Sequence, residues 1–296
     1  MTFSRIAVIY NPNSGRPRER QQSVERFAAL LHEAGRAVDI CPTQHPNHAT
    51  DLAREAIARG CELVIANGGD GTMNEVLQAV VGTEATLGFW PGGTANVLAA
   101  EIGFPADVNR VVERVLRAHT MKVTVGKANS RYFLLMAGVG MDAAVSAAVD
   151  PGLKRKIGKA AFGVAALKYF WRGEFQPVRV QFPGEEVEGR FVVAGNAHSY
   201  GGGFKLTPNA DLTDPELDIC VFNADNRLEF LKFALAAVAG WHQGMQNVVY
   251  RKVRSARILS ATDDEGEAAP VQLDGEVTGG LPLQLEAIPA AVSLLV

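Results

Sequence analysis

A glycine-rich turn around one carboxylate is the part of the sequence best suited to chemistry. It reads Asn67-Gly68-Gly69-Asp70-Gly71-Thr72, follows an apolar run at 63–66 and precedes a helical pattern of apolar residues. Glycines let backbone N–H groups approach phosphate oxygens closely, and the start of a helix adds positive potential. The turn therefore predicts a nucleotide phosphate site.

The elements around this turn predict a parallel sheet. Strands are expected at 6–10, 37–40, 63–66 and 87–90, and helices at 21–34, 49–59, 73–81 and 95–102. In sheets of alternating strands and helices, ligands collect beyond the carboxyl ends of the strands. We expect four loops to converge at that edge: Asn11 to Gly15, Thr43, Gly68 to Thr72, and Pro91 to Thr94.

The sequence becomes β-rich from about residue 123. Apolar or alternating runs occur at 122–125, 132–136, 178–182, 189–194, 217–222, 248–259, 271–273 and 283–287. Strands at such spacing are typical of a sandwich or barrel, and helical patterns interrupt them at 159–171 and 228–241. We therefore predict an α/β domain at 1–122, to which 288–296 returns, and a β-sandwich domain at 123–287.

Composition narrows the class of protein. The 296 residues include 29 basic and 32 acidic side chains, so no overall basic field favours nucleic acid. Three cysteines without CxxC spacing indicate neither a disulfide framework nor a cysteine-rich zinc site. The sequence shows neither a secretory signal pattern nor a run that would span a bilayer. We expect a cytoplasmic protein, soluble or peripheral to the membrane, for which a homo-oligomer is compatible with the sequence.

Two stretches superficially match other nucleotide motifs. Gly138-Val139-Gly140-Met141-Asp142-Ala143 has dinucleotide spacing, but no following strand carries an acidic residue for a ribose. The stretch 152–159 has one residue too many between its glycines for a phosphate loop, and Ala160 stands where serine or threonine would hold magnesium. Neither stretch is taken as a nucleotide site.

The order and spacing of several motifs resemble one known family. They are Asn-Pro-x-Ser-Gly at 11–15, the turn at 67–72, Pro-Gly-Gly-Thr-Ala-Asn at 91–96, Thr43 ahead of 48–53, 138–142, 201–203 with Pro208, and Leu-Asp-Gly-Glu at 273–276. Together they resemble the diacylglycerol kinase catalytic-domain family, which includes bacterial soluble lipid kinases and sphingosine kinases and is distantly related to NAD kinases. The resemblance covers nearly the whole chain.

The resemblance implies that the loops hold ATP. Asp70 would meet Mg²⁺, because a carboxylate beside phosphates is tolerated only with a cation between them. The alternative for Asp70 is a turn residue that caps the helix at 72–81. Asn96 is either a loop-stabilising amide or a contact to the substrate. The implied ATP-binding residues are Asn11, Ser14, Gly15, Thr43, Gly68, Gly69, Asp70, Gly71, Thr72, Asn74, Gly93, Thr94 and Asn96.

Asp274 and Glu276 are the implied candidates for the catalytic base. An alcohol is a poor nucleophile at neutral pH, so a carboxylate must orient it and accept its proton. Asp274-Gly275 alone would be read as a hairpin turn, and the resemblance favours the catalytic role. The sequence does not separate the two carboxylates, and in the distant NAD kinases the aspartate equivalent to Asp70 is itself a proposed base. An active site in a cleft between the two domains is expected.

A second magnesium site is implied at Asp211, Asp214 and Glu216. In similar bacterial lipid kinases this loop binds a structural Mg²⁺ through one aspartate side chain and flanking carbonyls. Pro215 departs from the family pattern, in which glycine usually follows the aspartate. The alternative reading is an Asp-Pro turn without metal.

A lipid acceptor requires contact with a bilayer. Leu228, Leu231, Leu235 and Val238 recur on one face of a predicted helix, and a basic run lies at 154–159. Core packing explains such an apolar stripe more often than membrane contact does.

The predicted function is an ATP- and Mg²⁺-dependent kinase that phosphorylates a lipid hydroxyl, of diacylglycerol or a sphingoid base. The alternatives are a kinase of a soluble hydroxyl compound on the same scaffold and a nucleotide-binding regulator without catalysis.

Overall fold

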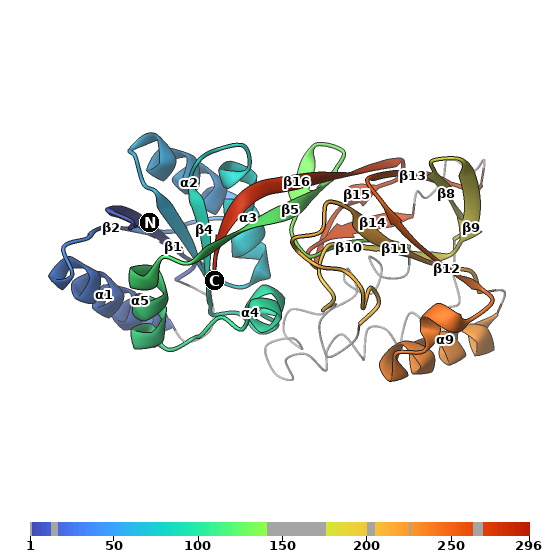
Figure 1. Cartoon of the computed structure of the whole chain (residues 1–296), viewed down its shortest axis with the longest axis horizontal. Helices are drawn as coiled ribbons and strands as arrows, with labels where there is room; N and C mark the ends of the chain where they lie inside the picture. The colour runs from blue at the N-terminus through green and yellow to red at the C-terminus, as the bar shows by residue number, and fades with distance from the viewer. Residues whose placement is uncertain (1, 13–16, 141–175, 200–204, 225, 263–268) are drawn as a thin grey trace. The chain divides into compact units, whose positions relative to one another are not determined.

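The chain divides into two compact units. The computed structural model describes residues 2–12, 17–140, 176–199, 205–224, 226–262 and 269–296. The first unit comprises Met1–Val123 with Ala290–Val296, and the second comprises Thr124–Pro289. Figure 1 shows the elements of both, which are described one unit at a time.

The first unit is built on a parallel sheet. Its strand order is β2-β1-β3-β4, with the carboxyl end of β16 pairing in parallel with β4. β1 and β3 are almost fully buried, as expected for a parallel sheet covered on both faces. The strands are β1 (Arg5–Tyr10), β2 (Ala37–Pro42), β3 (Leu63–Gly68), β4 (Thr86–Pro91) and β16 (Leu283–Leu295).

Helices connect these strands and pack in two pairs, α1 with α5 and α2 with α3. Four of them match predicted helices, whereas α5 was not predicted. Its start is fixed by Asp107, whose carboxylate accepts hydrogen bonds from the backbone N–H groups of Asn109 and Arg110. The helices are α1 (Pro17–Glu33), α2 (His48–Ala58), α3 (Asp70–Val80), α4 (Val97–Ile102) and α5 (Val108–Arg117).

Strand register brings the predicted loops to one edge of the sheet. Tyr10 at the end of β1 pairs with Pro42 of β2 and with Asn67 of β3. Gly68 of β3 in turn pairs with Pro91 of β4. The described loops after all four strands therefore meet at the carboxyl edge, which confirms the expected α/β arrangement.

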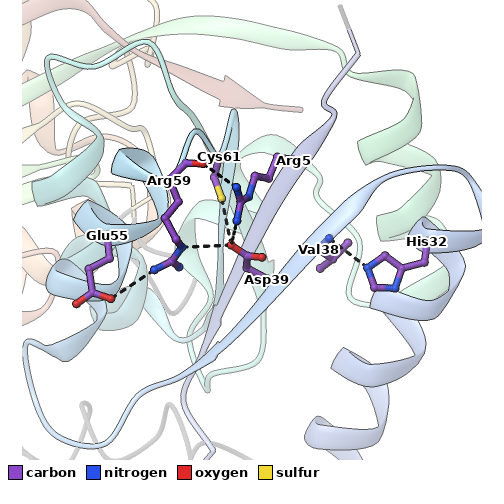
Figure 2. A network of polar contacts seen from close by, with 7 residues as sticks. All are labelled: Arg5, His32, Val38, Asp39, Glu55, Arg59 and Cys61. Atoms are coloured by element: carbon purple, nitrogen blue, oxygen red, sulfur yellow. Dashed lines mark hydrogen bonds and ion pairs between the residues drawn. The ribbon is translucent and has the colours of Figure 1, made fainter.

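A charged network lies toward the opposite end of these strands (Figure 2). Asp39 of β2 forms ion pairs with Arg5 at 3.2 Å and with Arg59 at 3.5 Å. The sulfur of Cys61 lies 3.7 Å from the same carboxylate, and burial raises the pKa of the Cys61 thiol. The network joins β1 and β2 to the chain that follows α2, so its role is structural.

The second unit is a β-sandwich, as predicted. One sheet has the order β12-β11-β10-β7-β14-β15, and the other contains β9, β8, β13, β16, β5 and β6. Its strands are β5 (Thr120–Ala128), β6 (Arg131–Phe133), β7 (Met136–Gly140), β8 (Val178–Phe182), β9 (Glu185–Gly189), β10 (Phe191–Gly195), β11 (Leu217–Phe222), β12 (Val248–Val253), β13 (Ser255–Ser260), β14 (Pro270–Leu273) and β15 (Glu276–Gly280). β5 and β16 contribute residues to both units.

Alternation along β11 shows how the six-stranded sheet is covered. Leu217, Ile219 and Val221 belong to the core shared with the other sheet. Phe222 points to the opposite side, where it stacks on Phe233 of α9 (Arg227–Ala239) with ring centroids 4.1 Å apart. Helix α9 and the short helix η1 (His242–Gly244) therefore belong to the outer face of this sheet.

The structure divides two predicted runs and adds elements. The run at 132–136 separates into β6 and β7, and the run at 248–259 separates into β12 and β13 at Arg254. β9 and β15 were not predicted as separate strands, because both are largely exposed and neither carries an apolar run: β9 is mostly glutamate, and β15 ends in two glycines. Ser14, Gly15, the helical pattern at 159–171, the basic run at 154–159 and the glycines at 201–203 lie outside the described residues. No helix in the described ranges is long and apolar enough to cross a bilayer.

Candidate active site

Two glycine-rich loops touch each other at the carboxyl edge of the first unit. The N–H of Gly92 donates to the carbonyl of Gly68 at 2.7 Å. A Cβ atom at Gly93 would lie only 2.5 Å from the Cα of Gly69, so the two backbones approach as closely as glycine allows. A Cβ at Gly68 would likewise lie 2.5 Å from the hydroxyl oxygen of Thr72. The turn predicted at 67–72 is thus half of a two-loop cradle.

Asp70 connects the two loops. One carboxylate oxygen accepts a hydrogen bond from the N–H of Val97 at 2.8 Å and a longer one from Leu98 at 3.5 Å, both at the start of α4. Asp70 is the first residue of α3, and its carboxylate caps the start of a neighbouring helix, α4. Asp70 therefore has a capping role toward α4, in addition to its predicted place in the glycine-rich turn.

Asn96 stabilises the second loop from within. Its side-chain oxygen accepts from the N–H of Gly93 at 2.8 Å, and its amide nitrogen donates to the carbonyl of Gly93 at 2.9 Å. The residue has a positive φ of 49°, a conformation that asparagine tolerates better than most residues. Of the two readings, the loop-stabilising amide has direct geometric support.

Arg20 of α1 is a site residue that sequence reasoning missed. Its guanidinium donates to the side-chain oxygen of Asn67 at 3.0 Å and to the carbonyl of Gly92 at 2.5 Å. These partners are 47 and 72 residues away, and the residues around Arg20 carry no motif. Burial lowers the pKa of Arg20. Arg20 brings a positive charge to both glycine loops.

The other predicted nucleotide residues of the first unit lie around the same edge or support it. The N–H of Asn11 donates to the carbonyl of Asn67 at 3.3 Å, and the N–H of Thr43 donates to Tyr10 at 2.9 Å. Thr94 is exposed, whereas Asn74 is buried in α3 and its side-chain oxygen accepts from Gln78 at 3.2 Å. Asn74 thus contacts Gln78, one turn further along α3.

Glu75, at the position after Asn74 in α3, caps a neighbouring helix as Asp70 does. Its carboxylate accepts from the N–H of Ala49 at 3.0 Å, in the first turn of α2. Asp70 and Glu75 thus use carboxylates of α3 to satisfy the amino ends of two other helices, which fixes those helices relative to α3.

Asp274 and Glu276 lie in the second unit, on a tight turn between β14 and β15. Asp274 is 7% exposed and has a positive φ of 49°. One of its oxygens accepts from the N–H of Leu134 at 2.9 Å, and the other accepts from Leu135 at 2.8 Å and Met136 at 3.0 Å. Glu276, the first residue of β15, is exposed. Asp274 therefore belongs to a hairpin turn and points into the unit, and Glu276 lies on the exposed side of the same hairpin.

The loop at 211–216 forms an Asx-type turn. The carboxylate of Asp211 accepts from the N–H and the hydroxyl of Thr213, both at 2.7 Å, and these bonds lower the pKa of Asp211. Asp214 accepts from the N–H of Glu216 at 3.1 Å and forms an ion pair with Lys252 at 2.6 Å. Among the described residues, no group of three acidic, histidine or cysteine side chains is placed to hold a metal.

Lys252 also faces a buried carboxylate that the sequence did not single out. Asp218 of β11 pairs in register with Lys252 of β12, and its carboxylate lies 3.7 Å from the lysine ammonium. Asp218 is 1% exposed, and burial raises its pKa. A lysine ammonium therefore stands beside the carboxylates of the predicted structural magnesium site.

Comparison with known proteins agrees with both units. Residues 5–128 match the model of the diacylglycerol kinase catalytic domain, and residues 136–296 match that of the YegS C-terminal NAD kinase beta sandwich-like domain. A diacylglycerol kinase of Bacillus subtilis is 30% identical over 288 residues, covering 95% of this chain and 92% of the relative. One of Staphylococcus carnosus is 29% identical, covering 94% and 90%.

A solved structure shows the same fold. The crystal structure of a diacylglycerol kinase from Bacillus anthracis superposes with a TM-score of 0.79 at 26% identity, covering 100% of this chain and 98% of the other. The resemblance stated from the motifs is confirmed along the length of the sequence. With a catalytic-domain match in the first unit and a sandwich-domain match over the second, the chain belongs to the diacylglycerol kinase family.

Proposed function

We propose that this protein is a kinase that transfers the γ-phosphoryl group of ATP, with Mg²⁺, to a hydroxyl group of a lipid such as diacylglycerol or a sphingoid base. The observation that carries the proposal is the two-loop cradle, in which Gly68–Gly69 and Gly92–Gly93 meet backbone to backbone beside Asp70. Such a cradle suits phosphate groups, because only glycine leaves room for backbone N–H groups to face them. Family membership supplies the reaction class.

The first unit would hold the nucleotide. The backbone N–H groups of the loop at 69–72, where α3 begins, and the hydroxyls of Thr43, Thr72 and Thr94 are suited to phosphate oxygens, and Arg20 adds positive charge to both loops. Asp70 would carry the Mg²⁺. When bound, the ion would neutralise charge that develops on the phosphoryl oxygens.

In the second unit, we assign the proton acceptor to Glu276 and a positioning role to Asp274. Both oxygens of Asp274 are already engaged by three backbone N–H groups, which fix the turn that carries Glu276. Glu276 would accept the proton of the lipid hydroxyl while the hydroxyl oxygen forms its bond to the γ-phosphorus. The bond from that phosphorus to the bridging oxygen breaks, and ADP leaves with the electron pair.

The test measures transfer of label from γ-labelled ATP to lipid in mixed vesicles that contain diacylglycerol or sphingosine. We expect labelled lipid from the parent and a fall in kcat of about 100-fold or more for Glu276→Gln, at an unchanged melting temperature. Asp274→Asn should instead lower the melting temperature, because the amide leaves a buried N–H without its acceptor, at about 1–3 kcal/mol. Glu188→Gln, an exposed glutamate of β9, is the matched control.

Other outcomes would redirect the proposal. ATP hydrolysis or transfer to a water-soluble alcohol, without label in lipid, would favour the kinase of a soluble acceptor. ATP binding without any transfer would favour a nucleotide-binding regulator. Full activity of Glu276→Gln would remove the role given to that carboxylate.

A further inference from the structure

Helix α9 presents an apolar face to solvent. Leu228, Leu231, Leu235 and Val238 are 60%, 46%, 63% and 65% exposed, and Trp241 directly after the helix is 78% exposed. We call these five residues the outward face of α9. Core packing, the more frequent explanation for such a stripe, does not account for them.

The helix does not need this face for its own stability. Its opposite side is anchored by Phe230, Phe233 and Ala237, which are all buried. Phe233 stacks on Phe222 and also contacts Phe191 of β10, at a centroid distance of 5.8 Å. Asn226 caps the start of the helix and Gly240 ends it with a φ of 78°. The outward face is therefore additional apolar surface.

Cations flank this face on both sides. At about 100° per residue, the four aliphatic side chains fall within an arc of about 80°. Arg227 lies about 20° beyond one side of the arc and Lys232 about 40° beyond the other, by the same geometry. Both are exposed, and the acidic Glu229 lies about 100° beyond, toward the buried side. An aliphatic strip flanked by two cations and followed by a tryptophan is suited to a membrane surface, because Lys and Arg can reach the headgroups and Trp favours the interface.

We propose that the outward face of α9 docks on the surface of an anionic lipid bilayer, with Arg227 and Lys232 reaching the headgroups. This inference rests on the proposed function, because the lipid acceptor resides in the bilayer. A second copy of the chain is a poorer occupant. A helix of 13 residues is about 20 Å long, so two such faces would bury on the order of 600 Å², less than a stable dimer needs.

The first experiment measures cosedimentation with vesicles of phosphatidylglycerol and phosphatidylcholine that contain no acceptor lipid. We expect the parent to bind, and Leu231→Glu/Leu235→Glu to bind at least tenfold less, with an unchanged melting temperature. Ile40→Glu/Leu116→Glu is the matched control, since both residues are 40% exposed in the first unit. The control should bind as the parent does.

A second measurement needs no charged variant. Brominated lipids should quench the part of the tryptophan emission that Trp241→Phe removes, because that indole is expected to lie among the acyl chains. Absence of this quenching, or equal vesicle binding by the parent and Leu231→Glu/Leu235→Glu, would overturn the proposal.

Further outcomes identify a different occupant. A concentration-dependent dimer that Leu231→Glu/Leu235→Glu dissociates would assign the face to a second copy. A loss of several degrees in melting temperature for the milder Leu235→Gln would indicate that the chain itself covers the face. Either result contradicts membrane docking.

The kinase and the docking surface can fail separately. Activity on a short-chain diacylglycerol that is monomeric in water should be equal in the parent and in Leu231→Glu/Leu235→Glu. Vesicle binding without any kinase activity would contradict the proposed function alone. Kinase activity on the monomeric acceptor without vesicle binding would contradict the docking surface alone.

Discussion

The carboxylate of Asp70 accepts a hydrogen bond from the N–H of Val97 at 2.8 Å. This bond joins the loop after β3 to the helix that follows the second glycine loop, across 27 positions of the sequence. Asp70 therefore has a structural role that is independent of any ion. A loss of activity on changing Asp70 must be separated from a loss of the loop contact.

Asp70→Asn and Asp70→Ala separate the structural role of Asp70 from its proposed role at Mg²⁺. Asparagine keeps an oxygen for the N–H of Val97 but loses the negative charge, so stability should be retained while kcat falls about 100-fold or more. Alanine also removes the cap of α4 and should cost a further 0.5–2 kcal/mol, approximately, in the free energy of unfolding. Thermal denaturation and ATP turnover check both. Retained activity in Asp70→Asn would mean that the charge is not needed.

The close approach of the two glycine loops predicts that Gly93→Ala is harmful. Its methyl group would meet the Cα of Gly69, which is backbone and cannot turn aside. We expect the loops to separate, at a cost on the order of 1–3 kcal/mol and with weaker ATP binding. Isothermal titration with ATP measures the affinity. The control is Gly244→Ala, whose added methyl would meet nothing within 4 Å.

Arg20→Met tests the residue that the sequence did not reveal. The change removes the donor to Asn67 and to Gly92 while keeping a long apolar side chain. We expect the KM for ATP to rise about tenfold, equivalent to ~1.4 kcal/mol, because the loop loses a charge-assisted bond. Arg18→Met, at an exposed position of the same helix, should leave KM unchanged. An unchanged KM in Arg20→Met would limit Arg20 to a purely structural role.

The sequence was sufficient to place the glycine loop and its neighbours at one sheet edge. Alternating strands and helices imply parallel strands, and parallel strands carry Asn11, Thr43 and Gly68 to the same side. What it could not supply were side-chain partners far apart in the chain. The donors to Asp274 lie 138–140 positions away, so its inward orientation follows from tertiary packing alone.

Periodicity also could not decide which faces of α9 are covered. Apolar residues occur all round this helix, with Phe230 and Phe233 facing the sheet and Leu235 facing solvent. A stripe recurring every three or four residues looks the same whether protein or solvent lies against it. Tertiary contacts such as the packing of Phe222 and Phe191 against Phe233 identify the inner side.

Lys252→Met tests whether the lysine ammonium or a metal ion balances the carboxylates of Asp214 and Asp218. The lysine lies 2.6 Å from Asp214 and 3.7 Å from the buried Asp218. Its removal should lower the free energy of unfolding at pH 7 by about 1–2 kcal/mol, less than for a fully buried pair because Lys252 is 37% exposed. Lys122→Met, at an exposed position of β5, is the control.

The pH dependence of that loss has a defined sign. Burial holds the pKa of Asp218 above its usual 3.8 in the folded state, so the folded protein binds more protons than the unfolded chain just above that pH. The contribution of Asp218 to stability therefore falls as the pH rises through the window from 3.8 to the folded pKa. Removing Lys252 raises that pKa further, because the ammonium lowers it. The loss in the free energy of unfolding caused by Lys252→Met should accordingly become smaller as the pH falls toward 4, because Asp218 is then increasingly protonated.

A magnesium ion bound at Asp211, Asp214 and Glu216 would make the melting temperature depend on the metal rather than on Lys252. EDTA would then lower the melting temperature of the parent, and Lys252→Met would have little effect in the presence of Mg²⁺. We expect EDTA to leave the parent unchanged, since Lys252 already provides the charge that faces Asp214. Lys252 belongs to β12, so its ion pair joins Asp214 to the sheet at any metal concentration. A bound Mg²⁺, in contrast, would be removed by EDTA.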